Sequence, residues 1–234
     1  MDLAQEFLDD LYIAFQPIML CSNITRIEGY EILLRSKKQG GFPEKIFAWF
    51  IEDDHRNARL MDYYLQELYT LRETHSDIKL SLNLHPQQLQ HPSTWDFLNN
   101  ISAIKKTLEI ELTEHYCEFS PLNREDHLEA FLSKLKEQGF SVAIDDVGTG
   151  QNNFEMVTRN VENISTIKIS LLKFRNLNEA VLFNFLNSWL FLSEHYQIKL
   201  IVEGIESESI STKLKDLGLI YQQGYYHGKA KVFS

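Results

Sequence analysis

Hydrophobic and polar positions divide the chain into short apolar runs separated by longer amphipathic segments. Eight runs rich in β-branched, aromatic and leucine residues predict β-strands at 12–18, 29–35, 78–84, 108–113, 142–145, 166–169, 199–202 and 221–225. Most of the intervening segments repeat their apolar residues at helical spacing. Strands that alternate with helices predict parallel strands joined by helical crossovers.

The clearest helical pattern lies at 124–138 and is followed by Gly139, a residue suited to a helix C-terminus. Its apolar face comprises Leu128, Phe131, Leu132 and Leu135. Further patterns predict helices at 179–195 and 207–217 and a helical hairpin at 43–73. Eight strands with such crossovers predict an α/β fold of the (β/α)8 barrel type.

One connection departs from an ideal barrel. Only residues 21–26 join the first two strands, which is too short for a crossover helix, so these strands should pair antiparallel. We therefore predict a modified TIM barrel with one antiparallel strand. With 234 residues and 44% hydrophobic content, the chain is expected to form this barrel as a single domain over residues 1–234.

Composition excludes several classes of protein. No apolar run reaches the roughly 18 residues of a membrane span, and the N-terminus lacks the pattern of a signal peptide, so we expect a soluble, cytoplasmic protein. Cys21 and Cys117 have no metal-binding spacing, which argues against a disulfide framework and a structural zinc site. A net charge of −10 disfavours DNA, RNA and anionic membranes as partners.

Polar side chains gather at the carboxyl ends of the predicted strands, where barrel enzymes have their active sites. Taken alone, each acid is most simply a solvated strand end or a turn former. Several carboxylates at one barrel mouth would repel each other, however, unless a cation offsets them. The residues concerned are Glu31, Arg35, Asn83, Glu111, Glu114, Asp145, Asp146, Lys168, Glu203 and Gln223.

The ligand types indicate which cation this is. Carboxylates with one Asn carbonyl form an oxygen site that suits Mg²⁺ or Mn²⁺ better than zinc or copper. Because the acids exceed what one octahedral ion needs, we expect two ions. Paired ions about 4 Å apart are a recurring device for the hydrolysis of phosphate esters.

Two cationic residues have both a structural and a functional interpretation. Lys168 lies between Ile167 and Ile169 and should point the opposite way from them. It is either a surface lysine, or a lysine beside the metals that orients or deprotonates the attacking water, with a pKa lowered by burial and nearby cations. Arg35 either forms a surface salt bridge or binds a substrate phosphate.

Eight short motifs occur in the order seen in EAL domains, and the chain resembles that family from about residue 12 to residue 229. They are FQPI at 15–18, EILLR at 31–35, SLNL at 81–84, ELTE at 111–114, DDVGTG at 145–150, IKI at 167–169, VEGIE at 202–206 and QGYY at 223–226. EAL domains hydrolyse the bacterial second messenger cyclic di-GMP to linear pGpG. The resemblance implies a signalling phosphodiesterase with cyclic di-GMP as substrate and two Mg²⁺ or Mn²⁺ ions.

The resemblance also implies roles for the matched residues at the metals. It makes Lys168 the lysine that orients the attacking water and a candidate general base. Glu203 resembles the acid that completes the metal and lysine network, and Gln223 resembles the glutamine near the catalytic water. The implied metal ligands are Glu31, Asn83, Glu111 and Asp145, with Asp146 bound to the second ion.

Three further positions match residues outside the metal ligands. Glu114 resembles an acid that braces the loop after the fifth strand, and in the family this loop also helps the domain to dimerise. The resemblance therefore implies a homodimer. Gln16 and Arg35 match positions that contact the guanine and phosphate ends of the substrate.

The chain departs from the family pattern at several positions. Ile32 and Val147 replace other apolar residues, and the run QNNF at 151–154 replaces a Tyr-Ser-Ser-Leu run, which affects loop closure and dimer coupling. Ser170 stands where the family has an acid, so one charge near the site is lost. His227 and Ala230 alter a turn near the C-terminus.

Three hypotheses follow. The first is an active cyclic di-GMP phosphodiesterase, because each position needed for two-metal chemistry carries a competent side chain. The second is a non-enzymatic module that binds cyclic di-GMP or a regulatory protein partner, which Ser170 and the altered loop keep open. The third is hydrolysis of a related phosphodiester.

Overall fold

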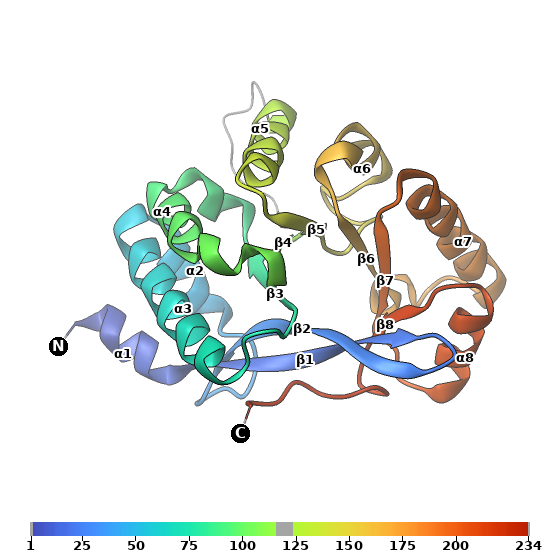
Figure 1. Ribbon diagram of the computed structural model, residues 1–234, viewed down its shortest axis with the longest axis horizontal. Coiled ribbons are helices and arrows are strands. Elements are labelled where there is room, and N and C mark those ends of the chain that lie inside the picture. Colours follow the sequence, from blue (N-terminus) through green and yellow to red (C-terminus); the bar gives the residue numbers. More distant parts are fainter. Residues whose placement is uncertain (1, 116–123, 234) are drawn as a thin grey trace.

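Eight strands close into a barrel within residues 2–115 and 124–233, the part of the chain that the computed structural model describes (Figure 1). The strands follow one another around the barrel in chain order. Each predicted strand is confirmed, with small shifts at its ends. Their bounds are β1 (Leu11–Cys21), β2 (Thr25–Ser36), β3 (Leu80–Leu84), β4 (Leu108–Leu112), β5 (Ser141–Ile144), β6 (Thr166–Ser170), β7 (Lys199–Glu203) and β8 (Tyr221–Gln223).

The first strand runs against all the others. β1 pairs antiparallel with both β2 and β8, whereas every other neighbouring pair in the barrel is parallel. A tight turn at residues 22–24 joins β1 to β2, and a β-bulge interrupts their register at Ile18 and Met19. The prediction of a TIM barrel with one antiparallel strand is therefore confirmed.

Helices surround the barrel on its outer side (Figure 1). The predicted hairpin at 43–73 is confirmed as α2 and α3, and the other predicted helices are α5, α7 and α8. Within the described residues, no helix is long and apolar enough to cross a membrane. The α-helices are α1 (Leu3–Asp10), α2 (Glu44–Ile51), α3 (Asp54–Thr74), α4 (Pro92–Asn100), α5 (Arg124–Glu137), α6 (Phe154–Arg159), α7 (Glu179–Tyr196) and α8 (Glu208–Asp216). Short 3-10 helices are η1 (Pro86–Gln90), η2 (Ile101–Thr107), η3 (Val161–Asn163) and η4 (Leu171–Phe174).

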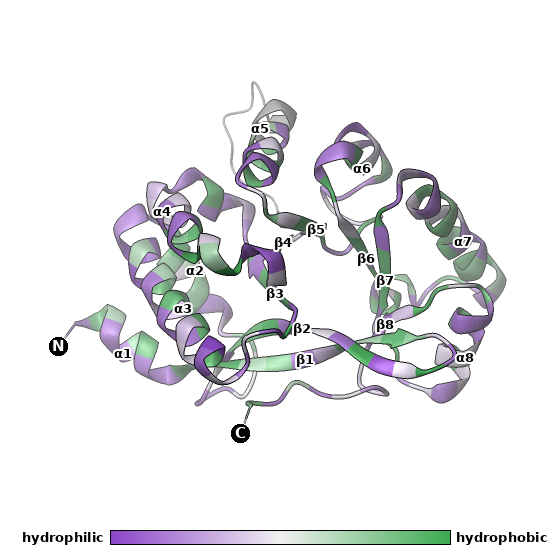
Figure 2. Ribbon diagram, viewed as in Figure 1, coloured by the Kyte–Doolittle hydropathy of each residue, from purple (hydrophilic) through white to green (hydrophobic). Residues whose placement is uncertain are grey.

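The hydrophobic core lies between the strands and the helices. Leu82 on β3 and Ile167 on β6 belong to one buried cluster with residues of the surrounding helices. Figure 2 shows these helices with hydrophobic positions interspersed by hydrophilic ones. Because side chains alternate along a strand, the next residues, Asn83 and Lys168, face the barrel interior. The alternation that builds the core therefore also directs polar side chains inward.

The cysteines take no part in a described metal site. Cys21 is buried on β1, and its Sγ lies 3.9 Å from Nε2 of His227. Cys117 lies outside the described residues.

Candidate active site

A buried lysine forms the centre of the polar barrel interior. The Nζ atom of Lys168 on β6 lies 2.5 Å from Oε1 of Glu111 on β4 and 2.5 Å from Oε1 of Glu203 on β7. It also lies 3.2 Å from Oε2 of Glu31 on β2. The side chain of Lys168 is only 1% exposed, so its interpretation as a surface lysine is wrong. Of the three acidic strands only β7 is a neighbour of β6, so Glu31 and Glu111 reach Lys168 across the barrel interior.

Two amide groups hold one of these acids in place. Nδ2 of Asn83 donates to Oε1 of Glu31 at 2.7 Å, and Nε2 of Gln223 donates to Oε2 of the same carboxylate at 2.6 Å. Burial raises the pKa of the Glu31 carboxyl, but Lys168 and the two amides outweigh it and hold that pKa below its ordinary value. Glu31 is therefore stabilised as an anion inside the barrel.

The pKa values of the neighbouring acids are raised rather than lowered. Burial, together with the adjacent Glu31 and Glu203 carboxylates, outweighs the attraction of Lys168 and raises the pKa of Glu111 to about 8. Burial, with neighbouring carboxylates, also raises the pKa of Asp145 and of Glu203. The interior thus holds more carboxylates than its lysine can neutralise.

The described residues alone hold the pKa of Lys168 high, and its lowering by bound cations stays a prediction. Burial lowers the pKa of its ammonium, but the surrounding carboxylates outweigh that effect and hold the pKa well above its ordinary value. The nearest described charges to this ammonium are the carboxylates of Glu31, Glu111 and Glu203.

A second group of acids lies at the end of β5. Asp146 has a left-handed backbone with a φ of 47°, and its N–H donates to Oδ1 of Asp145 at 2.8 Å. The Nζ atom of Lys173 on η4 lies 3.0 Å from Oε1 of Glu114 and 3.1 Å from Oδ2 of Asp146. Sequence reasoning missed Lys173, since nothing in the run LLKF that contains it distinguishes an inward lysine from a surface one.

Several buried oxygens in this site have no partner. Oε2 of Glu111, Oδ1 of Asp146 and Oε1 of Gln223 are buried without a hydrogen-bond partner among the described residues. Such orphaned oxygens are rare in folded proteins and indicate that something else binds there. Two groups of acids offer ligand atoms within 4.8 Å of one another: Glu31, Glu111 and Glu203, and Glu114, Asp145 and Asp146. This donor set fits hard divalent cations such as Mg²⁺ or Mn²⁺.

The divergent loop after β5 supports the second group of acids. Asn152 is 4% exposed, its Nδ2 donates to the Asp145 carbonyl at 2.5 Å, and its own carbonyl accepts from the Gly148 N–H at 2.7 Å. Asn153 caps α6 by accepting from the N–H of Met156 at 2.9 Å. Residues that depart from the family pattern therefore build the turn that holds Asp145.

A cavity of about 390 Å³ opens beside these acids. Glu31, Asn83, Asp145, Glu114 and Arg35 line it, together with an aromatic wall of Phe42, Phe47, Tyr64, His85 and His115. Burial and the neighbouring imidazole of His115 lower the pKa of His85 to about 4, so this ring is neutral near pH 7. The histidines of this wall were also missed, because no metal-ligand or catalytic spacing marks them.

The two predicted substrate-binding residues lie in different surroundings. Arg35 lines the cavity, and its Nη1 donates to the Leu34 carbonyl at 3.0 Å. Gln16 is not among the lining residues of this cavity, and its Nε2 donates to the Gly228 carbonyl at 3.4 Å. The structure therefore brings Arg35, but not Gln16, to the cavity with the acids.

Comparisons of sequence support one family. A family model described as "EAL domain" matches residues 2–230. The chain is 25% identical over 244 residues to the probable cyclic di-GMP phosphodiesterase PdeI of Escherichia coli (strain K12), covering 97% of this chain and 30% of the relative. It is 29% identical over 233 residues to the probable cyclic di-GMP phosphodiesterase PdeA of the same organism, covering 94% and 30%. The chain thus spans 30% of the length of each of these relatives.

Solved structures have the same fold. A standalone versatile EAL protein from Vibrio cholerae O395, solved with bound c-di-GMP, is 23% identical with a TM-score of 0.73, covering 95% of this chain and 93% of that one. The manganese and cy-diGMP complex of Klebsiella pneumoniae BlrP1 is 22% identical with a TM-score of 0.76, covering 95% and 56%. At these identities the likeness establishes the barrel fold.

Proposed function

Because the chain belongs to the EAL domain family, we propose that it is a metal-dependent phosphodiesterase that hydrolyses cyclic di-GMP to linear pGpG. The observation that carries this proposal is the buried cluster of Lys168 with three carboxylates, which has orphaned oxygens and lies beside an open cavity. The names of the curated relatives support the same reaction.

We propose two Mg²⁺ or Mn²⁺ ions as cofactors. When bound, two such ions supply Lewis-acid stabilisation of the phosphate and lower the pKa of a water molecule. The proposed ligands of the first ion are Glu31, Asn83, Glu111 and Asp145, and Asp146 is the proposed ligand of the second.

The remaining residues position the reacting groups. The ammonium of Lys168 reaches Glu31, Glu111 and Glu203, so a water molecule at this cluster would lie within its reach and be oriented by its N–H groups. Only the neutral amine, which nearby cations would favour, would take a proton from that water. Gln223 fixes the Glu31 carboxylate, and its own Oε1 is buried without a partner among the described residues, so it is the proposed contact of the catalytic water.

Substrate contacts are assigned to the cavity wall and its surroundings. Arg35 offers a guanidinium to a phosphate, and the faces of Phe47 and His85 suit the stacking of a base. Gln16 remains the proposed guanine contact, although in this structure its amide binds the Gly228 carbonyl. Glu114, which lies against Gly150, is the proposed brace of the loop after β5.

The same proposal extends to the domain organisation, the cellular location and the oligomeric state. We propose that residues 1–234 form one domain that acts in the cytoplasm, where a bacterial second messenger is degraded. We also propose a homodimer joined near the loop after β5.

A second candidate function is a module that binds cyclic di-GMP or a regulatory protein partner without efficient hydrolysis. Two features favour it. Ser170 lacks a carboxylate, and the ammonium of Lys173 already pairs with Glu114 and Asp146 in the second group of acids. The missing carboxylate and the paired ammonium both reduce the negative charge available to a second cation.

Incubation of the purified protein with cyclic di-GMP and Mg²⁺ or Mn²⁺, followed by chromatography, tests the choice. We expect pGpG to form, and we expect Glu31→Ala to abolish its formation while the circular dichroism spectrum stays unchanged. Retained binding of cyclic di-GMP without turnover in either metal would favour the module. Full activity of Glu31→Ala would show that the metal site is assigned wrongly.

A further inference from the structure

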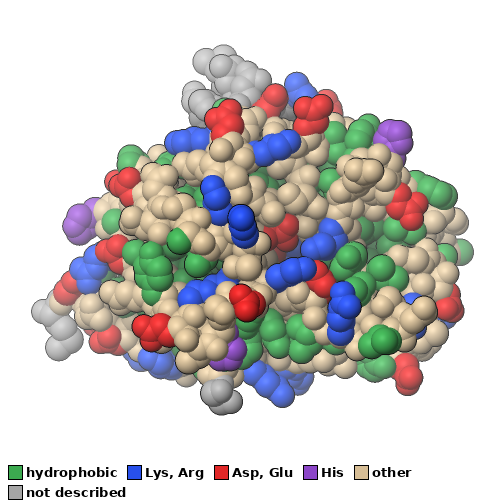
Figure 3. Space-filling view, in the orientation of Figure 1, with side chains coloured by type: hydrophobic (Ala, Val, Ile, Leu, Met, Phe, Trp, Pro, Cys, Tyr) green, Lys and Arg blue, Asp and Glu red, His purple; other side chains and the backbone are tan. Residues whose placement is uncertain are grey.

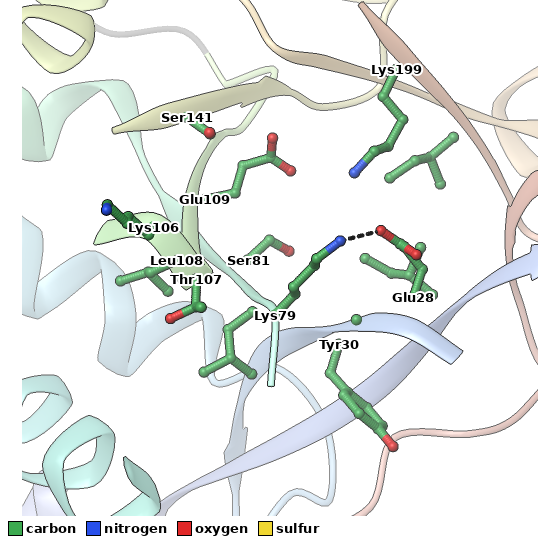
Figure 4. A pocket seen from close by; sticks show the side chains of 14 residues that line it. Glu28, Tyr30, Lys79, Ser81, Lys106, Thr107, Leu108, Glu109, Ser141 and Lys199 are labelled. Carbon is green, nitrogen blue, oxygen red and sulfur yellow. Dashed lines mark hydrogen bonds and ion pairs between the residues drawn. The ribbon is translucent and has the colours of Figure 1, made fainter. Parts of the chain in front are cut away.

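A second hollow lies at the opposite end of the barrel from the acid cluster. It has a volume of about 220 Å³ and is lined by the first residues of several parallel strands, among them Lys79 and Ser81 near the start of β3, Glu109 on β4 and Lys199 on β7. Figure 4 shows Lys79, Glu109 and Lys199 extending into one shared space. Barrel interiors are usually filled here by branched apolar side chains. The polar lining therefore calls for a separate explanation.

One buried hydroxyl in this hollow has no partner. Ser81 is 3% exposed, and its Oγ makes no hydrogen bond within the described part of the chain. A buried hydroxyl without a partner costs free energy, which a bound ligand or water recovers. Thr107 and Ser141 add two more hydroxyl groups to the lining. The Thr107 hydroxyl already donates to the Ile104 carbonyl at 3.1 Å, so among the described residues Ser81 and Ser141 are the hydroxyl donors that the hollow offers to a ligand.

Some charged side chains of the hollow have a partner, whereas Lys199 has no carboxylate partner among the described residues. Lys79 pairs with Glu28 at 2.5 Å, and Glu109 accepts a hydrogen bond from Thr166 at 2.7 Å. Among the described residues no carboxylate forms an ion pair with Lys199, whose Nζ lies 5.3 Å from the centre of the Tyr221 ring. Its positive charge is therefore available to an anion.

The charge around the hollow contrasts with that of the whole chain. Lys106 also lines the hollow, which gives three lysines against two glutamates there. Figure 3 shows several Lys and Arg side chains, with Asp and Glu side chains among them, near the middle of one face, although the net charge of the chain is −10. A local excess of cations in an acidic protein favours an anionic ligand.

We propose that this hollow binds a small phosphate-class anion, either inorganic phosphate or the phosphate end of a small phosphorylated metabolite. The volume is below the roughly 300 Å³ at which pockets for drug-sized ligands begin, which selects a small ligand. Donors that converge from separate strands suit a tetrahedral group with oxygens on every side better than a planar carboxylate. The acidic O–H of a phosphate monoanion can in turn donate to Glu109.

The site is tested by calorimetric titration of sodium phosphate into the metal-free protein, kept in a chelator. This measurement involves neither a nucleotide nor hydrolysis. Lys199→Met and Ser81→Val are expected to weaken the binding of phosphate at least about tenfold, because one removes the free ammonium and the other fills the hollow. The control Lys213→Met, on the surface of α8, is expected to bind phosphate like the unaltered protein. Arg35→Met discriminates between the two cavities, and binding to the hollow is expected to persist in it. Thermal melting checks that each variant is folded.

A second probe distinguishes the sources of the anion. Tighter binding of glycerol 3-phosphate than of phosphate supports a phosphorylated metabolite, and the reverse order supports inorganic phosphate. The proposal is overturned if neither probe binds, if sodium acetate binds as tightly as phosphate, or if Lys199→Met leaves the affinity unchanged. Loss of binding in Arg35→Met would place the anion at the other cavity and would also overturn it.

Discussion

Replacement of Lys173 by Met is expected to strengthen the binding of a divalent cation by the second group of acids. The ammonium of Lys173 lies 3.0 Å from Glu114 and 3.1 Å from Asp146, and a metal ion must displace it from both. The lysine side chain is 43% exposed, so each ion pair is partly screened by solvent. At about 0.2–1 kcal/mol for each such pair, the two contribute about 0.4–2 kcal/mol together. This corresponds to a gain of about twofold to about thirtyfold in affinity for Mn²⁺.

Calorimetric titration of Mn²⁺ into the metal-free protein measures this gain directly. Lys213→Met is a matched control, because Lys213 forms a similarly exposed ion pair with Glu179, at 2.5 Å, on other elements of the fold. We expect the affinity of the weaker class of sites to rise in Lys173→Met and to stay constant in Lys213→Met. An equal Mn²⁺ affinity in Lys173→Met and the unaltered protein would refute the competition between lysine and metal, and so would an equal rise in both variants.

Three further predictions address the lysine cluster, the acids and the loop. Lys168→Met leaves buried carboxylates without their cation, so the free energy of unfolding of the metal-free protein, measured in urea, should fall by about 3–5 kcal/mol. If Lys168 acts on the attacking water, the same variant should hydrolyse the substrate about 10²–10⁴-fold more slowly, and an unchanged rate would contradict that role. The pKa of Glu111 is raised in the folded protein, so its contribution to stability is complete below the ordinary value of 4.5 and is lost as the pH rises to about 8. The melting temperature in chelator should therefore decrease across that interval and decrease less with Mn²⁺, whereas a rise in chelator would show that the sign is wrong. Asn152→Ala should lower the free energy of unfolding by about 1–3 kcal/mol, because the Asp145 carbonyl loses its side-chain donor. An unchanged free energy of unfolding in a urea titration would show that this loop residue does not support the turn.

Most of the fold could be predicted from the sequence, because the same short-range pattern determines both strands and connections. Alternating apolar residues must face the helices, and the short link at 21–26 leaves no room for a crossover. Local patterns were less informative at the N-terminus, where α1 begins after an Asp2 cap and was not predicted. Its apolar positions are too few to separate a short helix from a surface segment.

The candidate site could be predicted only in part. Strand-end acids such as Glu31 and Glu111 are visible in sequence, because the topology brings the ends of parallel strands together. The reach of a long side chain is not visible, since Lys173 could equally extend into solvent. The hollow below the site was missed for a related reason. Ser81 and Lys199 near the starts of their strands are typical of exposed positions until the barrel closes around them.

The left-handed backbone at Asp146 has a consequence for the evolution of this chain. At a φ of 47° most side chains are strained, whereas Gly, Asn and Asp are tolerated. The codons of Asp differ from those of Asn and of Gly by one base. A single point mutation can therefore remove this carboxylate without straining the turn. Under the proposed function, this opens a short mutational path from a two-metal enzyme to a folded protein that only binds its ligand. Drift toward a receptor is thus conformationally easy at this position, and under the proposed function selection for turnover would have to act continually to retain the acid.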